Sequence, residues 1–168
     1  GGKSKLAPYL KRAIKKQRNG KLVYIEPFAG GAGVALDLLI NNAVDEIVIN
    51  DYDKAIYSFW RAVKEDPQYL IKLIQETPIT IKEWTKQKEI YLKGSKYSVE
   101  LGFAAFFLNR TNRSGILNAG PIGGMEQKGN YKIDARFNKT DLIKRIQQVV
   151  KCRDKIVVYN KEIRSLLN

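Results

Sequence analysis

Three glycines within four positions, in YIEPFAGGAGVAL (residues 24–36), constrain the fold of this chain more than any other feature. The run before them, KLVYIE (21–26), has the apolar and β-branched residues of a buried strand, and the run after them (32–42) has helical spacing. A second apolar run, DEIVIND (45–51), indicates another strand. Strand, glycine turn, helix and strand within about thirty residues predict a βαβ unit, and therefore a parallel, doubly wound α/β sheet.

Glycine at this density leaves room for a ligand to approach the main chain. The backbone amides of Gly30, Gly31 and Ala32 are expected at the start of a helix, where N–H groups lack helical partners. A phosphate-binding P-loop is rejected, because Gly33 is not followed by Lys and Ser or Thr. A dinucleotide or adenosyl cofactor needs an acidic residue about 20 positions further on, and Asp51 is there. The alternative is a tight βα turn that binds nothing.

The rest of the chain is mainly helical before it returns to an α/β pattern. Helices are expected in the segments 6–17, 54–64, 67–76, 80–92, 96–110 and 139–151. The segment SGILNAGPIGGMEQKGNYKID (114–134) contains five glycines, which favours a loop or a β-hairpin. KIVVYN (155–160) indicates a third strand, and another helix is expected to begin in the last eight residues, 161–168.

Composition narrows the possible partners and chemistry. Lys and Arg number 30 against 17 Asp and Glu, and the formal charge of +13 favours a polyanionic partner over a merely basic surface. Histidine is absent and Cys152 is the single cysteine, so we expect no His-based triad, no disulfide and no metal site. No apolar run reaches the roughly 18 residues of a membrane span, and no secretory signal is recognised, so the expected compartment is the cytoplasm.

Four segments together resemble the Dam-like DNA adenine methyltransferases. EPFAGGAG (26–33) resembles the cofactor motif of S-adenosylmethionine-dependent methyltransferases, and GGKSKL (1–6) resembles the motif that precedes it in this family. NDYD (50–53) resembles the ribose-binding turn, and FFLNRTNRSGI (106–116) resembles the segment that leads into the DNA-recognition hairpin. The motifs occur in the order of the family, and the resemblance covers essentially the whole chain.

The resemblance implies a site for S-adenosylmethionine. Lys3 would lie near the cofactor carboxylate, and Asp51 would bind the ribose hydroxyls. The expected cofactor-binding residues are Lys3, Phe28, Gly30, Gly31, Asp51 and Tyr52. Phe28 and the glycines would surround the methionine moiety, and Tyr52 would flank the adenine ring. The sequence departs from the strict motif at Ala32, where the family has glycine, although alanine is small enough to leave the site intact.

The resemblance also implies double-stranded DNA as a partner. Polar side chains at the end of the helix 96–110, and in the glycine-rich segment behind it, can contact phosphates or base edges. The expected DNA-binding residues are Arg110, Asn112, Arg113, Ser114, Lys128 and Lys132, with Tyr131 and Arg136 in the same segment. For residues 109–115 alone, the alternative is a capped helix end. Trp60 and Trp84 are expected in the core instead of stacked on bases.

The family methylates an adenine that is flipped out of the duplex and held by a D/N/S-P-P-Y/F turn. No two of the five prolines are adjacent here, so no residue is assigned as catalytic. Three explanations are open: a fragment of a larger enzyme, one half of a split enzyme, or a degenerate module that binds without transferring. A three-stranded sheet would expose a strand edge, which favours a missing C-terminal segment or a second chain.

We therefore expect an incomplete Rossmann-like methyltransferase sheet with an inserted helical target-recognition region. Residues 1–54 would form the cofactor-binding part, 55–138 the insertion, and 139–168 the return to the sheet, ending before the catalytic motif. The expected function is site-specific DNA adenine methylation with S-adenosylmethionine. The alternatives are a non-catalytic DNA-binding module with a vestigial cofactor site and an RNA methyltransferase.

Overall fold

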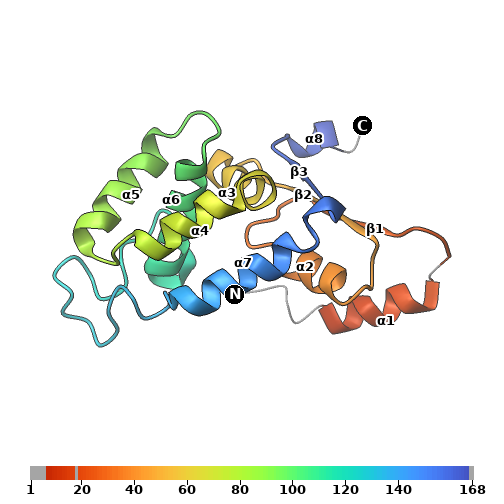
Figure 1. Cartoon of the computed structure of the whole chain (residues 1–168), viewed down its shortest axis with the longest axis horizontal. Helices are drawn as coiled ribbons and strands as arrows, with labels where there is room; N and C mark the ends of the chain where they lie inside the picture. Colours follow the sequence, from red (N-terminus) through yellow and green to blue (C-terminus); the bar gives the residue numbers. More distant parts are fainter. Residues whose placement is uncertain (1–6, 18, 167–168) are drawn as a thin grey trace.

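The computed structural model describes residues 7–17 and 19–166 (Figure 1). The strands are β1 (Val23–Glu26), β2 (Glu46–Asn50) and β3 (Ile156–Tyr159). The helices are α1 (Ala7–Gln17), α2 (Gly33–Ile40), α3 (Lys54–Glu65), α4 (Pro67–Glu76), α5 (Ile81–Lys93), α6 (Val99–Thr111), α7 (Lys139–Val150) and α8 (Ile163–Leu166). Two short 3-10 helices, η2 (Arg113–Gly115) and η3 (Arg153–Lys155), complete the order.

The three strands form one parallel sheet in the order β1-β2-β3, which confirms the expected α/β fold. Ile47 of β2 pairs with Tyr24 on one side and Ile156 on the other, and this row belongs to the main hydrophobic core. Within the described residues, β1 pairs only with β2. One edge of β1 is therefore unpaired, and Ile25 on it is 49% exposed.

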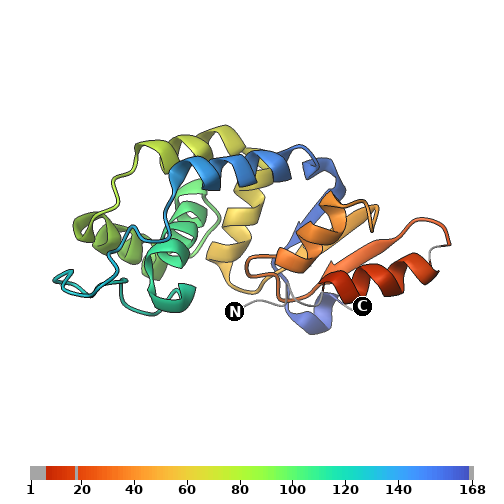
Figure 2. The same ribbon diagram turned by 90° about the horizontal axis from the view of Figure 1, so that it is seen from below.

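Helices α3 to α6 are inserted between β2 and β3 and form a lobe beside the sheet (Figure 1). Each of the four starts at a side chain that accepts a backbone N–H of the first turn, which fixes where the helix begins. These caps, including the one on α7, are Asp53, Asp66, Thr80, Ser98 and Asn138. Helix α7 then runs from the lobe back toward the sheet (Figure 2).

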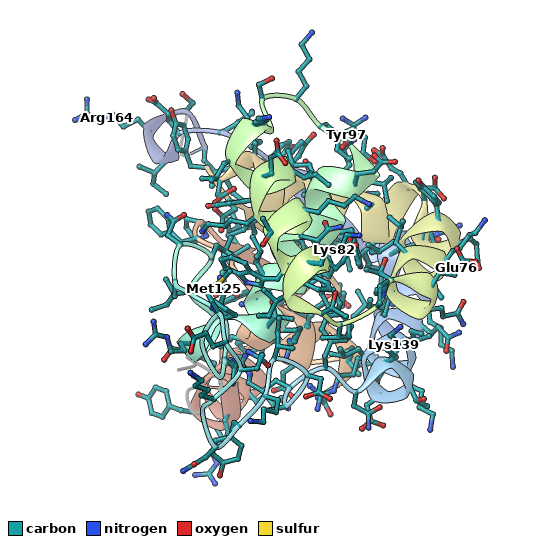
Figure 3. The ribbon with its side chains drawn as sticks, turned by 90° about the vertical axis from the view of Figure 1, so that its left-hand side faces the viewer. Glu76, Lys82, Tyr97, Met125, Lys139 and Arg164 are labelled. Carbon is teal, nitrogen blue, oxygen red and sulfur yellow. The ribbon has the colours of Figure 1, made fainter. Side chains whose placement is uncertain are left out.

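The start of α7 is tied to the end of α4 by one lysine. Lys139 Nζ donates to the carbonyl oxygens of Gln75 at 2.8 Å and Thr77 at 2.7 Å, beside Glu76 (Figure 3). A cation at these carbonyls also complements the negative end of the helix dipole. This contact holds α4 and the start of α7 together at the point where the chain leaves the lobe.

Helices α3 and α6 make the tightest contact of the lobe. A Cβ atom on Gly102 of α6 would lie 2.6 Å from the backbone nitrogen of Phe59 in α3, so only glycine fits there. One helical turn further along α6, the rings of Phe59 and Phe106 stack with centroids 5.3 Å apart. Trp60 and Trp84 are buried, as expected from their spacing. Among the described residues, no helix combines the length and the apolar character that a membrane crossing requires.

We expect Gly102→Ala to lower the free energy of unfolding by about 1–3 kcal/mol or more, because the new methyl group must push two main chains apart. Gly31→Ala is the matched control, since a Cβ there would meet no atom within 4 Å in the part of the chain that the structure describes. Urea denaturation of both variants measures the difference. Equal midpoints and slopes for Gly102→Ala and the wild type would contradict the close approach.

Candidate functional site

The glycine turn lies at the carboxyl end of β1, next to the residue that follows β2. Gly30 has a φ of +47°, a conformation that glycine adopts without the penalty of a Cβ atom. Asp51 accepts the Gly30 N–H at 2.8 Å through Oδ2 and the Asp53 N–H at 3.0 Å through Oδ1. The structure therefore brings together the turn and the acidic residue that the sequence places about 20 positions apart.

The glycine turn provides room for a ligand but few free hydrogen-bond donors. Gly30 donates its amide to Asp51, and Ala32 donates its amide to the Ala29 carbonyl at 2.6 Å. The amides of Gly30 and Ala32 are therefore bonded within the protein and are not free donors for a ligand. A Cβ at Gly30, Gly31 or Gly33 would meet no atom of the described residues within 4 Å, so these residues leave the face of the turn that carries no side chains open.

Two exposed aromatic rings stand beside this open turn in the sequence. Phe28, just before it, is 64% exposed, and Tyr52, just after Asp51, is 67% exposed. Each oxygen of the Asp51 carboxylate keeps a second lone pair for a hydroxyl donor. Apolar rings, a carboxylate and open backbone are groups that an adenosyl ligand can use. Lys3 lies outside the described residues.

Three buried polar side chains that the sequence analysis did not assign hold the turn in place. Trp60 of α3 donates its indole N–H to the Gly30 carbonyl at 2.8 Å. Glu26 is buried and accepts the Ala35 N–H at 3.3 Å, at the start of α2. Asn50 is buried and donates to the carbonyls of Pro27 and Lys161. Polar residues ending the apolar strands were a usable signal for Glu26 and Asn50, whereas no local pattern marks Trp60.

The cap of α3 also joins the insertion to the site. Asp53 accepts the Ala55 N–H at 2.8 Å through Oδ1 and the hydroxyl of Tyr91, from α5, at 3.0 Å through Oδ2. Burial, followed by the charge of Asp53 and this hydrogen bond, raises the pKa of Tyr91 to about 12. The hydroxyl therefore stays protonated and donating throughout the neutral range.

A cavity of about 730 Å³ adjoins the turn, between α2, α3, α6 and α7. Its volume is in the range of small-molecule sites. Gly30 and Gly31 line it, but Phe28, Asp51 and Tyr52 do not. The cavity therefore meets the expected cofactor residues only at the glycines and extends away from Asp51 toward Arg110 and Arg145.

Asn112, expected among the DNA contacts, is fully buried. Its Oδ1 accepts the indole N–H of Trp84 at 2.6 Å, and its Nδ2 donates to the carbonyls of Ile116 and Leu117 at 2.9 and 3.0 Å. All of its polar atoms are engaged inside the protein, so the expectation of a DNA contact is corrected. Asn112 instead fixes the path of the chain beyond α6.

The segment 114–134 is a loop and not a hairpin, and its one bridge joins Pro121 to Asn112, which precedes the segment. Gln127 organises it, because its Nε2 donates to the carbonyls of Ile122 and Gly124 and its Oε1 accepts the Ile133 N–H. Side-chain amide bonds here replace the ladder that a hairpin would have.

The remaining expected DNA contacts differ in how free their side chains are. Arg113 and Ser114 are exposed at η2, where Ser114 has a φ of +56°. Lys132 donates to two loop carbonyls, of Gln127 and Gly129, and Lys128 is exposed and paired with Glu126. Arg110 is half-buried at the end of α6.

Comparison with known proteins agrees with this architecture. Residues 1–167 match the model of the D12 class of N6 adenine-specific DNA methyltransferases, and the chain belongs to this family. The resemblance inferred from the four sequence motifs is thereby confirmed. Among the elements described above, the family match spans both the sheet and the inserted lobe.

Two curated relatives are type II methyltransferases. M1.LlaDCHI of Lactococcus lactis subsp. cremoris is 30% identical over 92 residues, which are 55% of this chain and 28% of the relative. M.MjaIII of Methanocaldococcus jannaschii is 25% identical over 166 residues, which are 90% of this chain and 57% of the relative. The chain thus spans little more than half of one relative and less than a third of the other.

We expect Trp60→Phe to lower the free energy of unfolding by about 1 kcal/mol, because the Gly30 carbonyl loses its donor while the apolar packing is largely kept. Tyr69→Phe is the control, since it removes only an exposed hydrogen bond to Glu100 and should cost less than about 0.5 kcal/mol. Chemical denaturation of both variants gives the comparison. Equal losses for the two variants would show that the indole N–H does not support the turn.

Tyr91→Phe should change how stability responds to alkaline pH. Because the pKa of Tyr91 is raised from 10.0 to about 12 in the folded state, its stabilisation is complete below pH 10 and is lost as the pH rises toward 12. The variant should therefore lose less stability than the wild type over this interval, as measured by urea unfolding at successive pH values. Tyr131→Phe, at an exposed position, should follow the wild type.

Proposed function

We propose that this protein binds S-adenosylmethionine at the glycine turn and takes part in N6 methylation of adenine in double-stranded DNA. One observation carries the proposal: the Gly30 amide is bonded to Asp51, so an open glycine turn stands directly beside a carboxylate. Membership of the D12 family supports the reaction class.

The cofactor, when bound, supplies an activated methyl group, and the residues of this chain would bind and orient it. Asp51 would accept hydrogen bonds from the ribose hydroxyls with the lone pairs that the backbone leaves free. Phe28 and Tyr52 would pack against the apolar parts of the ligand, and Gly30 and Gly31 would let it approach the main chain. Lys3 remains the proposed partner of the cofactor carboxylate.

DNA is proposed to contact the loop that follows α6. Arg113 and Ser114 are exposed where α6 ends, and Lys128 and Lys132 add positive charge further along the loop. The net charge of +13 supports a polyanionic substrate. Two relatives are named type II methyltransferases, which supports a role in restriction-modification. A reaction on double-stranded DNA would fit the cytoplasmic compartment that the sequence predicts.

Methyl transfer also needs a turn that holds the amino group of the flipped adenine. The 168 residues contain no pair of adjacent prolines that could form the family's turn. We propose that residues outside these 168 supply it, either on the same polypeptide or on a second chain. The greater length of the relatives supports this division.

We expect Asp51→Asn to weaken S-adenosylmethionine binding roughly 10- to 100-fold, the effect of losing a hydrogen bond to a charged group. Asp154→Asn is the matched control, because Asp154 is an exposed carboxylate in η3, before β3. Isothermal titration calorimetry measures both affinities. Unchanged affinity in Asp51→Asn would contradict the cofactor assignment.

Arg113→Ala should weaken binding to duplex DNA by a similar factor for all DNA sequences. It should also lower the slope of log affinity against log salt by about one. Arg153→Ala, an exposed arginine in η3, controls for net charge. Fluorescence anisotropy at several salt concentrations gives both slopes. A preference of the wild type for structured RNA over duplex DNA at the same salt would contradict the proposed substrate.

A further inference from the structure

Three arginines lie near one another beside the cavity. Arg110 lies in the last turn of α6, Arg136 lies in the loop before α7, and Arg145 lies on α7. Arg110, Arg145 and Gly115 line the same cavity. A Cβ atom on Gly115 would lie 3.3 Å from Nη2 of Arg136, so the third guanidinium stands at the same place. In the described chain, none of the three arginines forms an ion pair.

Among the described residues, these positive charges have no acidic partner. The Nε of Arg110 is buried and donates to no acceptor in this part of the chain. Burial, and after it the charges of Arg136 and Arg145, lower the pKa of Arg110. Among the described residues, Asp37 is the one carboxylate lining the cavity, and it pairs with Lys11 at 2.6 Å. Arg136 and Arg145 are exposed, and an anion bound between them and Arg110 would offset the repulsion within the cluster.

The chemistry of the cluster favours a phosphate group. Guanidinium groups present planar pairs of donors that match phosphate oxygens, and arginines are the usual residues at such sites. The cluster also adjoins the loop proposed to contact DNA, because Arg113 and Ser114 lie between Arg110 and Gly115 in the chain. The backbone of a duplex lying on this loop would bring phosphates to the same place.

We propose that Arg110, Arg136 and Arg145 together bind a single backbone phosphate of the DNA, at the junction of α6, η2 and α7. The identity of the anion rests on the proposed function, whereas the presence of an anion site does not. The sequence analysis named Arg110 and Arg136 but not Arg145, which lies beyond the recognition segment on a helix that returns to the sheet. The bound phosphate would fix the position of the duplex without reading its sequence.

The first test uses inorganic phosphate and no DNA. The melting temperature of the wild type should rise more in phosphate than in chloride at equal ionic strength, because an anion that binds the folded state stabilises it. Arg145→Gln should lose this difference, and Arg153→Gln should retain it. In chloride, Arg145→Gln should melt at or above the wild-type temperature, since it relieves a repulsion.

The second test asks whether one phosphate is shared. In the double variant Arg136→Gln/Arg145→Gln, the slope of log DNA affinity against log salt should fall by about one. In each single variant, the slope should fall by about one or less. Two independent phosphate contacts would instead lower the slope by about two in the double variant. Arg153→Gln sets the baseline for losing one distant charge.

The outcomes separate this inference from the proposed function. If phosphate stabilises wild type and Arg145→Gln equally, the anion site is overturned, whatever the protein does with DNA. A phosphate effect that needs Arg145, in a protein without affinity for duplex DNA, keeps the anion site and overturns the proposed substrate. A slope change of two overturns the shared phosphate, and weaker S-adenosylmethionine binding in Arg145→Gln would assign the arginines to the cofactor carboxylate instead.

Discussion

The contact of α3 with α6 at Gly102 positions both halves of the proposed site. Because a Cβ there would lie 2.6 Å from the main chain of α3, the two helices approach as closely as backbones allow. Helix α3 carries Trp60, which donates to the carbonyl of Gly30, and the last turn of α6 carries Arg110 and is followed by the buried Asn112. The glycine turn and the start of the loop proposed to contact DNA are therefore placed by the same packed pair of helices. A wider spacing would displace one of them relative to the other.

Local patterns in the sequence were enough to predict the strands, most helices and the pairing of the glycine turn with Asp51. Alternation, glycine spacing and capping residues act over short stretches of chain, so they can be recognised without coordinates. Burial of Asn112 could not be predicted, because its partner Trp84 lies on another helix. Neither the hydrogen bond from Trp60 to Gly30 nor the position of Arg145 at the cavity could be predicted, because both depend on contacts between segments far apart in the chain. The hairpin alternative for 114–134 failed because Gln127 satisfies backbone groups that strand pairing would otherwise satisfy.

The polar side chains of the loop after α6 form two groups, one that bonds to the main chain and one that is exposed or charged. Asn112, Gln127 and Lys132 bond to main-chain atoms and give the loop its shape. Arg113 and Ser114 are exposed, and the arginine cluster behind them lacks acidic partners in the described chain. Shape and charge are thus supplied by different residues. Because of this division, a substitution can change the charge of the surface without changing the shape of the loop.

Helix α3 touches the glycine turn through Trp60 and touches α6 through Phe59, two neighbouring residues of one rigid element. A ligand that tightens the turn and a ligand that tightens the end of α6 act on the same helix. By thermodynamic linkage, if one ligand changes the affinity for the other by some factor, the second ligand changes the affinity for the first by the same factor. The order in which the two ligands bind is therefore decided by their association and dissociation rates. The free energy of the complex with both ligands is the same whichever binds first.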